Sequence, residues 1–301
     1  MKAVQFNEYG GPEVLKIVEI DEPHAGAGQV RVAVKTVGVN PAEWKLRAGF
    51  FKDFMPVELP SGVGFEAAGI VDEVGEGVTG VAIGDAVFGA GTGTLAEHAV
   101  LNYWARKPDA MPFDVAGGFA VVSETAIRSL DYAGVKAGET VLICGAAGGV
   151  GSTAVQIARA RGITVIGTAS VAKHDYLRGL GAVPTTYGPG LSDRVKDLAP
   201  QGVDAALDLA GAGNIPELIE MTGDASRVVS IVDFTAPEHG AQFTPTPQEH
   251  PERALAEAAR LYSEGALNLR IDKTFPMARI ADAHALSAEG HVTGKLVMMV
   301  S

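Results

Sequence analysis

The stretch that most constrains the fold runs from Thr140 to Gly151 and reads TVLICGAAGGVG. Its first five residues are apolar or β-branched, as a parallel strand buried on both faces requires. A glycine-rich turn follows, and apolar residues then recur at helical spacing, at Val150, Ala154, Ile157 and Ala158. Strand, glycine turn and helix in this order are the context in which a glycine motif binds a dinucleotide.

The turn itself is a variant of the dinucleotide-binding fingerprint. Ala146, Gly148 and Gly151 take the three positions that are usually glycine. A glycine at 148 lets the backbone approach a pyrophosphate, and a glycine at 151 lets the helix pack closely on the strand. The amides of Gly149 and Val150, at the start of the helix, favour the anion. The turn therefore predicts a dinucleotide site, against the plainer alternative of an αβ turn without a ligand.

The end of the next strand indicates which dinucleotide binds. Residues 164–168, TVIGT, form that strand, and an NAD enzyme usually places an acid near its end to hold the ribose 2′-hydroxyl. No carboxylate stands there, whereas Ser170 offers a hydroxyl and Lys173 a cation, which suit a 2′-phosphate. An ordinary solvated lysine is the alternative for Lys173, so the missing acid carries more of the argument. The pattern favours NADPH over NADH.

The composition excludes several classes of function. A formal net charge of −12 argues against binding to nucleic acid or to an anionic membrane. No apolar run reaches the length of about eighteen residues that a membrane span needs, and without an apolar signal region we expect a cytosolic protein. The only cysteine, Cys144, excludes an internal disulfide and a zinc site of several cysteines. Its place at the end of a buried strand predicts a packing role.

A change of pattern near residue 118, in a chain of 301 residues, predicts two domains. Before it, short strands and dense glycine turns are typical of an all-β, barrel-like unit. After it, strands alternate with helices, which predicts a doubly wound parallel α/β sheet. We expect a helix at 278–289 and a strand at 295–300, and both should return to the first domain. The irregular segment 235–248 predicts a mobile flap near the cofactor. The expected strands of the sheet are 140–144, 164–168, 184–187, 203–209 and 226–232, with 267–272 as a candidate sixth.

Several stretches carry a family resemblance: MKAVQFNEYGGPEVL, GVNPAEWKLRAG, LPSGVGFEAAGIVDEVGEGV, GDAVFG, CGAAGGVGSTAVQIA and GHVTGKLV. They resemble the medium-chain dehydrogenase/reductase superfamily and, within it, the zinc-free quinone oxidoreductase or ζ-crystallin-like branch. The resemblance implies a GroES-like catalytic domain, residues 1–118 completed by 273–301, with a Rossmann domain at 119–272. It also implies that NADPH binds in the cleft between them and that the protein is a homodimer.

Two departures from zinc-dependent relatives bear on the metal. Those relatives carry a cysteine where Asn40 stands and a histidine where Phe65 stands, and they often have a four-cysteine structural lobe. A catalytic zinc needs three protein ligands with nitrogen, sulfur or oxygen donors, and Glu66 alone cannot hold it. We therefore expect hydride transfer without a metal.

The resemblance implies three catalytic residues. Asn40 would line the nicotinamide end of the cleft, and an Asx turn before Pro41 is its structural alternative. Thr125 would contact the nicotinamide from the start of the Rossmann domain. Lys45 either orients or protonates a substrate carbonyl oxygen, or is an exposed helix lysine.

Other residues are expected around the rest of the site. Tyr187 would pack near the 2′-phosphate, unless it is an ordinary tyrosine at a strand end. Val232 and Phe234 would offer backbone contacts to the carboxamide, and Lys295 would reach the cofactor. Four aromatic residues form either an apolar wall for a flat substrate or part of the core: Trp44, Phe50, Phe51 and Phe54.

These features predict an NADPH-dependent enzyme that passes hydride to a quinone, with the cofactor carrying the difficult step. Water can protonate a quinone oxygen, so this chemistry requires neither a Ser-His-Asp set nor paired carboxylates. An NADPH-dependent enoyl or 2-alkenal reductase is the alternative enzyme. A non-catalytic NADPH-binding protein is the alternative outside catalysis.

Replacing Lys173 by alanine should raise the KM for NADPH about tenfold or more and should change the use of NADH little. The lost charge-assisted hydrogen bond contributes about 1.5–3 kcal/mol, and ~1.4 kcal/mol corresponds to one decade in affinity. Ser170→Asp should shift the preference toward NADH, because a carboxylate would stand against the phosphate. The measurement is kcat/KM for both cofactors, and equal losses with both would contradict the phosphate assignment.

Overall fold

The computed structural model describes residues 1–53 and 55–300, and the chain forms two compact units. The first comprises Met1–Val121 and Leu269–Ser301, and the second comprises Val122–Asn268. The boundaries predicted from the sequence follow residues 118 and 272. Among the described residues, no helix has both the length and the apolar character needed to cross a membrane.

The first unit contains two β-sheets. Its strands are β1 (Lys2–Phe6), β2 (Lys16–Glu19), β3 (Val30–Val39), β4 (Ser61–Gly62), β5 (Glu66–Val74), β6 (Ala86–Ala90), β7 (His98–Leu101), β8 (Tyr103–Arg106), β15 (Ile271–Pro276) and β16 (Lys295–Met299). The larger sheet has the order β15-β16-β3-β5-β6-β8, with β7 also paired to β3, and the smaller has the order β2-β1-β4. Val30, Val32 and Val34 of β3 are buried and alternate with less buried residues, because successive side chains of a strand point to opposite faces of the sheet.

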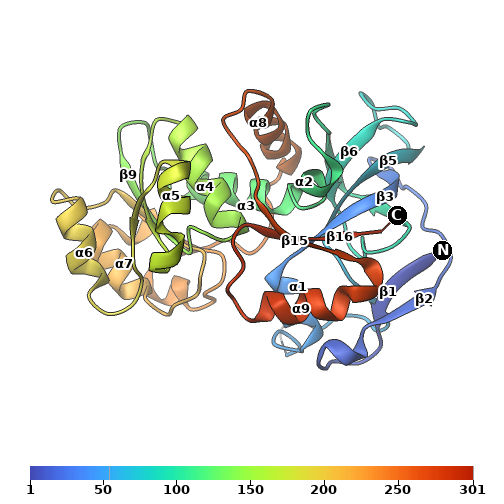
Figure 1. The fold of residues 1–301 in the computed structure, drawn as a ribbon, viewed down its shortest axis with the longest axis horizontal. Helices are drawn as coiled ribbons and strands as arrows, with labels where there is room; N and C mark the ends of the chain where they lie inside the picture. The colour runs from blue at the N-terminus through green and yellow to red at the C-terminus, as the bar shows by residue number, and fades with distance from the viewer. Residues whose placement is uncertain (54, 301) are drawn as a thin grey trace. The chain divides into compact units, whose positions relative to one another are not determined.

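The C-terminal segment returns to the first unit, as predicted. β16 pairs antiparallel with β3, and β15 pairs parallel with β16. Helix α9 (Ile280–Ala288) packs against α1 (Pro41–Arg47), and Figure 1 shows the two side by side; α2 (Phe113–Gly117) contacts β3. The prediction that 267–272 adds a sixth strand to the parallel sheet is wrong. β15 begins only at Ile271, and its backbone hydrogen bonds go to β16.

The second unit is built on one parallel sheet. Its strands are β9 (Thr140–Cys144), β10 (Thr164–Thr168), β11 (Val183–Thr185), β12 (Ala205–Asp208), β13 (Val228–Ser230) and β14 (Gln242–Phe243). The order β11-β10-β9-β12-β13-β14 is that of a doubly wound dinucleotide-binding fold. β9 and β10 have the predicted bounds. The sixth strand, β14, comes instead from 235–248, the segment predicted to be an irregular flap.

Helices cover both faces of the parallel sheet, and Figure 1 shows α4 and α5 on one side of it with α6 and α7 on the other. Leu191 and Val195 of α6 and Leu218 of α7 pack with Leu142 and Val228 of the sheet. On the opposite face α4 contacts α5 and α8. The helices of this unit are α3 (Ala120–Tyr132, which begins in the first unit), α4 (Gly149–Ala160), α5 (His174–Leu180), α6 (Leu191–Leu198), α7 (Ile215–Thr222) and α8 (Pro251–Ser263).

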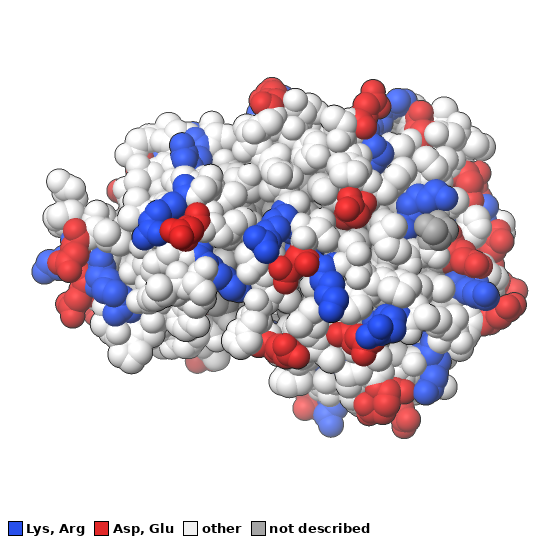
Figure 2. Space-filling model, viewed as in Figure 1, with Lys and Arg blue, Asp and Glu red and all other residues white. Residues whose placement is uncertain are grey.

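The surface carries charges of both signs. Figure 2 shows lysine and arginine side chains interspersed with aspartate and glutamate over the face in view. Some form ion pairs along a single helix, such as Arg178 with Asp175 and Arg260 with Glu264, each at 2.6 Å. Exposed pairs of this kind contribute about 0–1 kcal/mol each, so the buried core carries most of the stability.

Cys144 ends β9 and is buried. Burial, helped by the nearby carboxylate of Asp208, raises the pKa of the thiol to about 12. The thiolate is the reactive form of cysteine, so this side chain is protonated and inert at neutral pH. Its role is packing.

Cys144 should therefore resist a thiol-specific disulfide reagent in the native protein at pH values up to about 9, because its thiol stays protonated there. Unfolding in denaturant should expose it and make labelling fast. The measurement is the labelling rate against pH, with the unfolded protein as control. Fast labelling of the folded chain near pH 8 would show that the thiol is exposed or ionised.

Candidate functional site

The glycine turn joins β9 to α4. Gly148 precedes the first helical residue with φ −76° and ψ 177°, and no side chain caps the helix start. Gly148, Gly149 and Val150 are partly exposed, whereas Ala146 and Gly151 are buried. The first amides of a helix without a side-chain cap are donors that an anion can use. The turn therefore presents backbone donors at positions 149 and 150, where the sequence places the pyrophosphate.

Gly148 and Gly151 have different surroundings. A Cβ at Gly148 would meet only the carbonyl oxygen of Gly145, at 3.6 Å, so there is open space in front of the turn. A Cβ at Gly151 would lie 2.2 Å from that same oxygen and 2.7 Å from Cα of Ala146. The first position leaves room for a phosphate, and the second is required for the helix to approach the strand. The turn thus fits a dinucleotide.

Hydrogen bonds tie the glycine turn to the end of β10. The Gly145 amide donates to Oγ1 of Thr168 at 3.1 Å, and the Ala146 amide donates to the Thr168 carbonyl at 3.0 Å. Ser170 and Lys173 follow within a few residues, and both are half-buried. Since β9 and β10 are parallel neighbours, the glycine turn and this segment lie at the same edge of the sheet. Tyr187, after β11, is also at this edge and is 62% exposed.

Asp208, which sequence reasoning missed, organises the next strand end. It is fully buried at the end of β12. One carboxylate oxygen accepts hydrogen bonds from the amides of Ala210 at 3.2 Å and Gly211 at 2.9 Å. The other accepts from the Ser230 hydroxyl at 2.8 Å. An acid that closes an apolar strand is the signal that could have identified it.

Ser230 connects Asp208 to the loop after β13 by hydrogen bonds. Its hydroxyl oxygen accepts hydrogen bonds from the amides of Val232 at 3.2 Å and Asp233 at 2.9 Å. Phe234 is half exposed, with its ring 4.7 Å from that of Phe243. The loop predicted to contact the carboxamide is therefore held by a chain of hydrogen bonds that starts at Asp208.

Thr125 lies on α3 and is 7% exposed. Its hydroxyl accepts a hydrogen bond from Arg128 at 3.4 Å, and Arg128 pairs with Glu124 at 2.9 Å. Arg128 also donates to the carbonyl of Thr244, beside β14. Both charged side chains are buried, and neither was identified from the sequence. Their spacing of four residues, an acid followed by a base on one helix, is the available signal.

In the first unit, Asn40 belongs to a buried polar network. Its side-chain nitrogen donates to Glu43 at 2.9 Å and to Glu66 at 3.1 Å, and its side-chain oxygen accepts from Lys295 at 2.6 Å. Lys295 also pairs with Glu66 at 2.7 Å. The ammonium of Lys295, predicted to reach the cofactor, is thus engaged by two neighbours. Its contact with the cofactor stays a prediction.

The predicted substrate residues lie on and after α1. Lys45 is half-buried, with its Nζ 5.8 Å from the centre of the Trp44 ring. Trp44 also meets Phe50 edge-on, at 5.6 Å between ring centres. Phe50 is 64% exposed and so is not a core residue, while Phe51 is half-buried. Phe54 lies outside the described residues.

Metal ligands are not clustered in the part of the chain that the structure describes. No group of three or more His, Cys, Asp or Glu side chains there could hold an ion. The side-chain amide of Asn40 is engaged by charged neighbours, and Phe65 has no donor atom. Positions 40 and 65 therefore do not offer the donors that zinc prefers.

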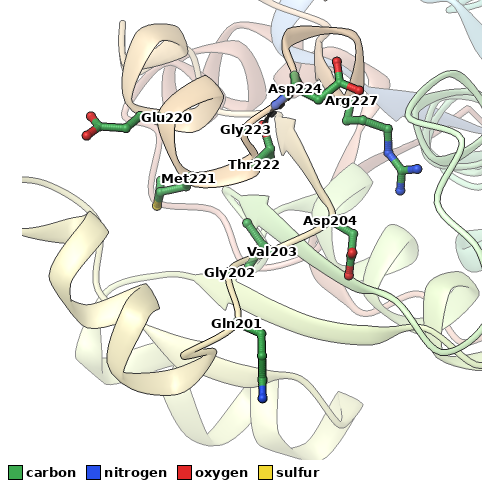
Figure 3. Close-up of a pocket in the computed structure, with 10 residues that line it drawn as sticks. All are labelled: Gln201, Gly202, Val203, Asp204, Glu220, Met221, Thr222, Gly223, Asp224 and Arg227. Atoms are coloured by element: carbon green, nitrogen blue, oxygen red, sulfur yellow. Dashed lines mark hydrogen bonds between the residues drawn. The ribbon is translucent and has the colours of Figure 1, made fainter.

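A surface hollow of about 440 Å³ lies near the amino ends of the parallel strands, at the opposite end of β9 from the glycine turn. Asp204, on its rim, precedes β12 and accepts a hydrogen bond from the first amide of β9, whereas the glycine turn follows the last residue of β9. Figure 3 shows that the charged side chains around it do not converge on one point. The hollow is thus separate from the candidate site; it is lined by Gln201, Gly202, Val203, Asp204, Glu220, Met221, Thr222, Gly223, Asp224 and Arg227.

Comparison with known proteins identifies the family. Residues 26–120 match the alcohol dehydrogenase GroES-like domain, and residues 189–298 match the zinc-binding dehydrogenase family model. The human quinone oxidoreductase is 30% identical over 325 residues, covering 100% of this chain and 98% of the human protein. The chain belongs to the quinone oxidoreductase branch of the medium-chain dehydrogenase/reductase superfamily. The family and the fold predicted from the sequence, a Rossmann sheet with a GroES-like domain, are confirmed.

Proteins with different names are similar to this chain in fold or in sequence. The quinone oxidoreductase of Escherichia coli, solved with NADPH, is 25% identical with a TM-score of 0.86, covering 100% of this chain and 98% of that one. CurK enoyl reductase is 26% identical with a TM-score of 0.89, covering 100% and 99%. The pikromycin polyketide synthase component PikAII of Streptomyces venezuelae is 35% identical over 296 residues, which are 91% of this chain but 8% of that protein. The fold alone therefore does not choose the substrate.

Gly148→Val should abolish binding of NADPH while the protein stays folded, because the side chain would fill the open space in front of the turn. Gly151→Ala is the matched control. It should lower the melting temperature, because its Cβ would meet backbone at 2.2 Å. Fluorescence titration with NADPH and thermal unfolding measure the two effects. Unchanged affinity in Gly148→Val would show that the phosphates bind elsewhere.

Proposed function

We propose that this chain is an NADPH-dependent oxidoreductase that transfers hydride to a quinone without zinc. The observation that carries the proposal is the glycine turn, with Ser170 and Lys173 at the same sheet edge, in a chain of the quinone oxidoreductase branch. The uncapped start of α4 binds the pyrophosphate, and the hydroxyl and cation after β10 bind the 2′-phosphate. The E. coli relative solved with NADPH supports this cofactor.

The protein's own part in the reaction is to hold and orient. When bound, NADPH supplies the hydride. The loop that Asp208 and Ser230 order presents the backbone of Val232 and Phe234 to the carboxamide. Contacts of Asn40 and Thr125 with the nicotinamide, and of Lys45 with a substrate oxygen, are part of the proposal and rest on the family resemblance.

Independence from zinc rests on the donors at positions 40 and 65. The family model that matches residues 189–298 is named for zinc binding, yet Asn40 presents an amide whose oxygen already accepts from Lys295. Phe65 presents a hydrocarbon ring.

Reduction of an enoyl or 2-alkenal double bond is the second candidate. The likeness to CurK enoyl reductase, with a TM-score of 0.89, favours it. The exposed ring of Phe50, beside Trp44, suits a flat acceptor of either kind. The homodimer and the cytosolic location expected from the sequence stay predictions.

The purified protein should oxidise NADPH in the presence of quinones, with a larger kcat/KM than for enones or enoyl thioesters. A metal chelator should leave the rate unchanged. Loss of NADPH absorbance measures the reaction, and Gly148→Val is the inactive control. Faster reaction with enoyl thioesters or enones would favour the second candidate. Binding of NADPH without oxidation by any acceptor would favour a non-catalytic protein, and loss of activity with chelator would contradict the metal-free mechanism.

A further inference from the structure

The network around Asn40 satisfies almost all of that side chain's hydrogen-bonding capacity. A primary amide has two N–H donors and a carbonyl oxygen with two lone pairs. Both donors of Asn40 go to carboxylates, of Glu43 at 2.9 Å and of Glu66 at 3.1 Å, and one lone pair accepts from Lys295 at 2.6 Å. Asn40 is also the N-cap of α1 and forms a capping box with Glu43, but its side chain makes no hydrogen bond that caps the helix, and the Glu43 amide donates to the Asn40 backbone carbonyl at 3.0 Å. One acceptor position on the side-chain oxygen is therefore left.

The charges of the network also fix which way the amide points. If the amide turned over, its oxygen would face two carboxylates and its N–H groups would face an ammonium. Asn40, Glu43, Glu66 and Lys295 are each at most 6% exposed, so water screens these interactions little. The amide therefore has one favoured orientation.

The surrounding backbone leaves room for the Glu66–Lys295 pair. A Cβ at Gly38 would lie 2.3 Å from Oε1 of Glu66, and a Cβ at Gly118 would lie 2.7 Å from Cγ of Lys295. The second oxygen of Glu66 accepts the amide of Val121 at 2.8 Å. Two glycines and a backbone donor thus complete the shell of this pair.

One further titratable side chain faces the network. The ring of His284 on α9 is fully buried, and its Nε2 lies 3.6 Å from Oε2 of Glu43, beyond hydrogen-bond distance. Neither ring nitrogen of His284 has a hydrogen-bond partner in the structure. The carboxylate of Glu43 is therefore held mainly by Asn40, through the side chain and through the backbone amide at 3.2 Å.

Stability alone is a weak reason for a buried network of this kind. Replacing buried ion pairs by apolar side chains of similar volume is often neutral or stabilising. Here the charges converge on one amide, at the position that the proposed function assigns to the nicotinamide end of the site.

We propose that Glu43, Glu66 and Lys295 are positioning residues for Asn40. Because both of its N–H donors are used by the two carboxylates, its side chain can only accept a hydrogen bond from a bound ligand. In this orientation Asn40 accepts from an N–H or O–H group of the nicotinamide riboside and does not donate to the oxygen of the substrate. The proposal rests on the proposed function, because it takes the place of Asn40 from it.

The test compares the wild type with the double variant Lys295→Met/Glu66→Gln, which removes both charges of the pair together. Arg161→Met/Glu257→Gln is the matched control, since it removes an ion pair of 3.0 Å in the second unit. The first readout needs no cofactor: the side-chain NH2 signals of Asn40 in a ¹H–¹⁵N spectrum, assigned by their loss in Asn40→Asp. The wild type and the control should show two separate signals in slow exchange with water. The double variant should show faster exchange.

The second readout is kinetic. The double variant should lower kcat with a quinone about tenfold to a hundredfold, as expected for a misplaced group at the reacting end. The KM for NADPH should change by a smaller factor than kcat, because the phosphates bind at the other unit's sheet edge. The single variant Lys295→Arg, which keeps a cation at this position, should have a kcat between those of the double variant and the wild type. Glu43→Gln, which changes one atom, should lower kcat in the same direction if the double variant does not fold.

Rapid exchange of the Asn40 amide in the wild type would overturn the proposal. So would an unchanged kcat in a double variant whose Asn40 signals have moved. A wild type that oxidises no NADPH with any acceptor would overturn the proposed function, and the spectrum would still decide whether the network holds Asn40.

Discussion

The close approach of α4 to the end of β9 is the constraint on which the candidate cofactor site depends. It requires glycine at 151, where a Cβ would lie 2.2 Å from the Gly145 carbonyl. Because the helix can approach this far, its first amides face the same sheet edge as the end of β10. The proposed pyrophosphate and 2′-phosphate positions then depend on this helix approach together with the hydrogen bonds that join the glycine turn to Thr168.

Local pattern was sufficient for the centre of the parallel sheet. β9 and β10 were predicted to the residue because their apolar runs are bounded by glycines and polar turns. The prediction that 267–272 joins the parallel sheet was wrong because a short apolar run does not show which sheet will supply its hydrogen-bond partners. β14 has only two residues, in a proline-containing stretch, and its pairing with β13 is long-range information.

The candidate site was predicted unevenly for the same reason. Gly148 and Ser170 belong to local motifs and could be recognised from their neighbours in sequence. Asp208 and Arg128 act through partners in other loops, and no local pattern reveals such partners. The GHVTGKLV stretch drew attention to Lys295, but its hydrogen bond to Asn40, 255 positions away, could not be read from the sequence.

The return of β16 to β3 has a consequence for how the chain is made. As synthesis proceeds from the N-terminus, β3 emerges early, while its neighbour β16 and the ammonium of Lys295 arrive about 255 residues later. All strands of the second unit lie between them, so that unit has its complete sequence before the first unit does. Until then residues 36–39 of β3 lack the partner strand that β16 supplies, and Glu66 lacks its counter-ion. The nascent chain therefore passes through a stage in which the second unit has its whole sequence while the larger sheet of the first unit still lacks β15 and β16.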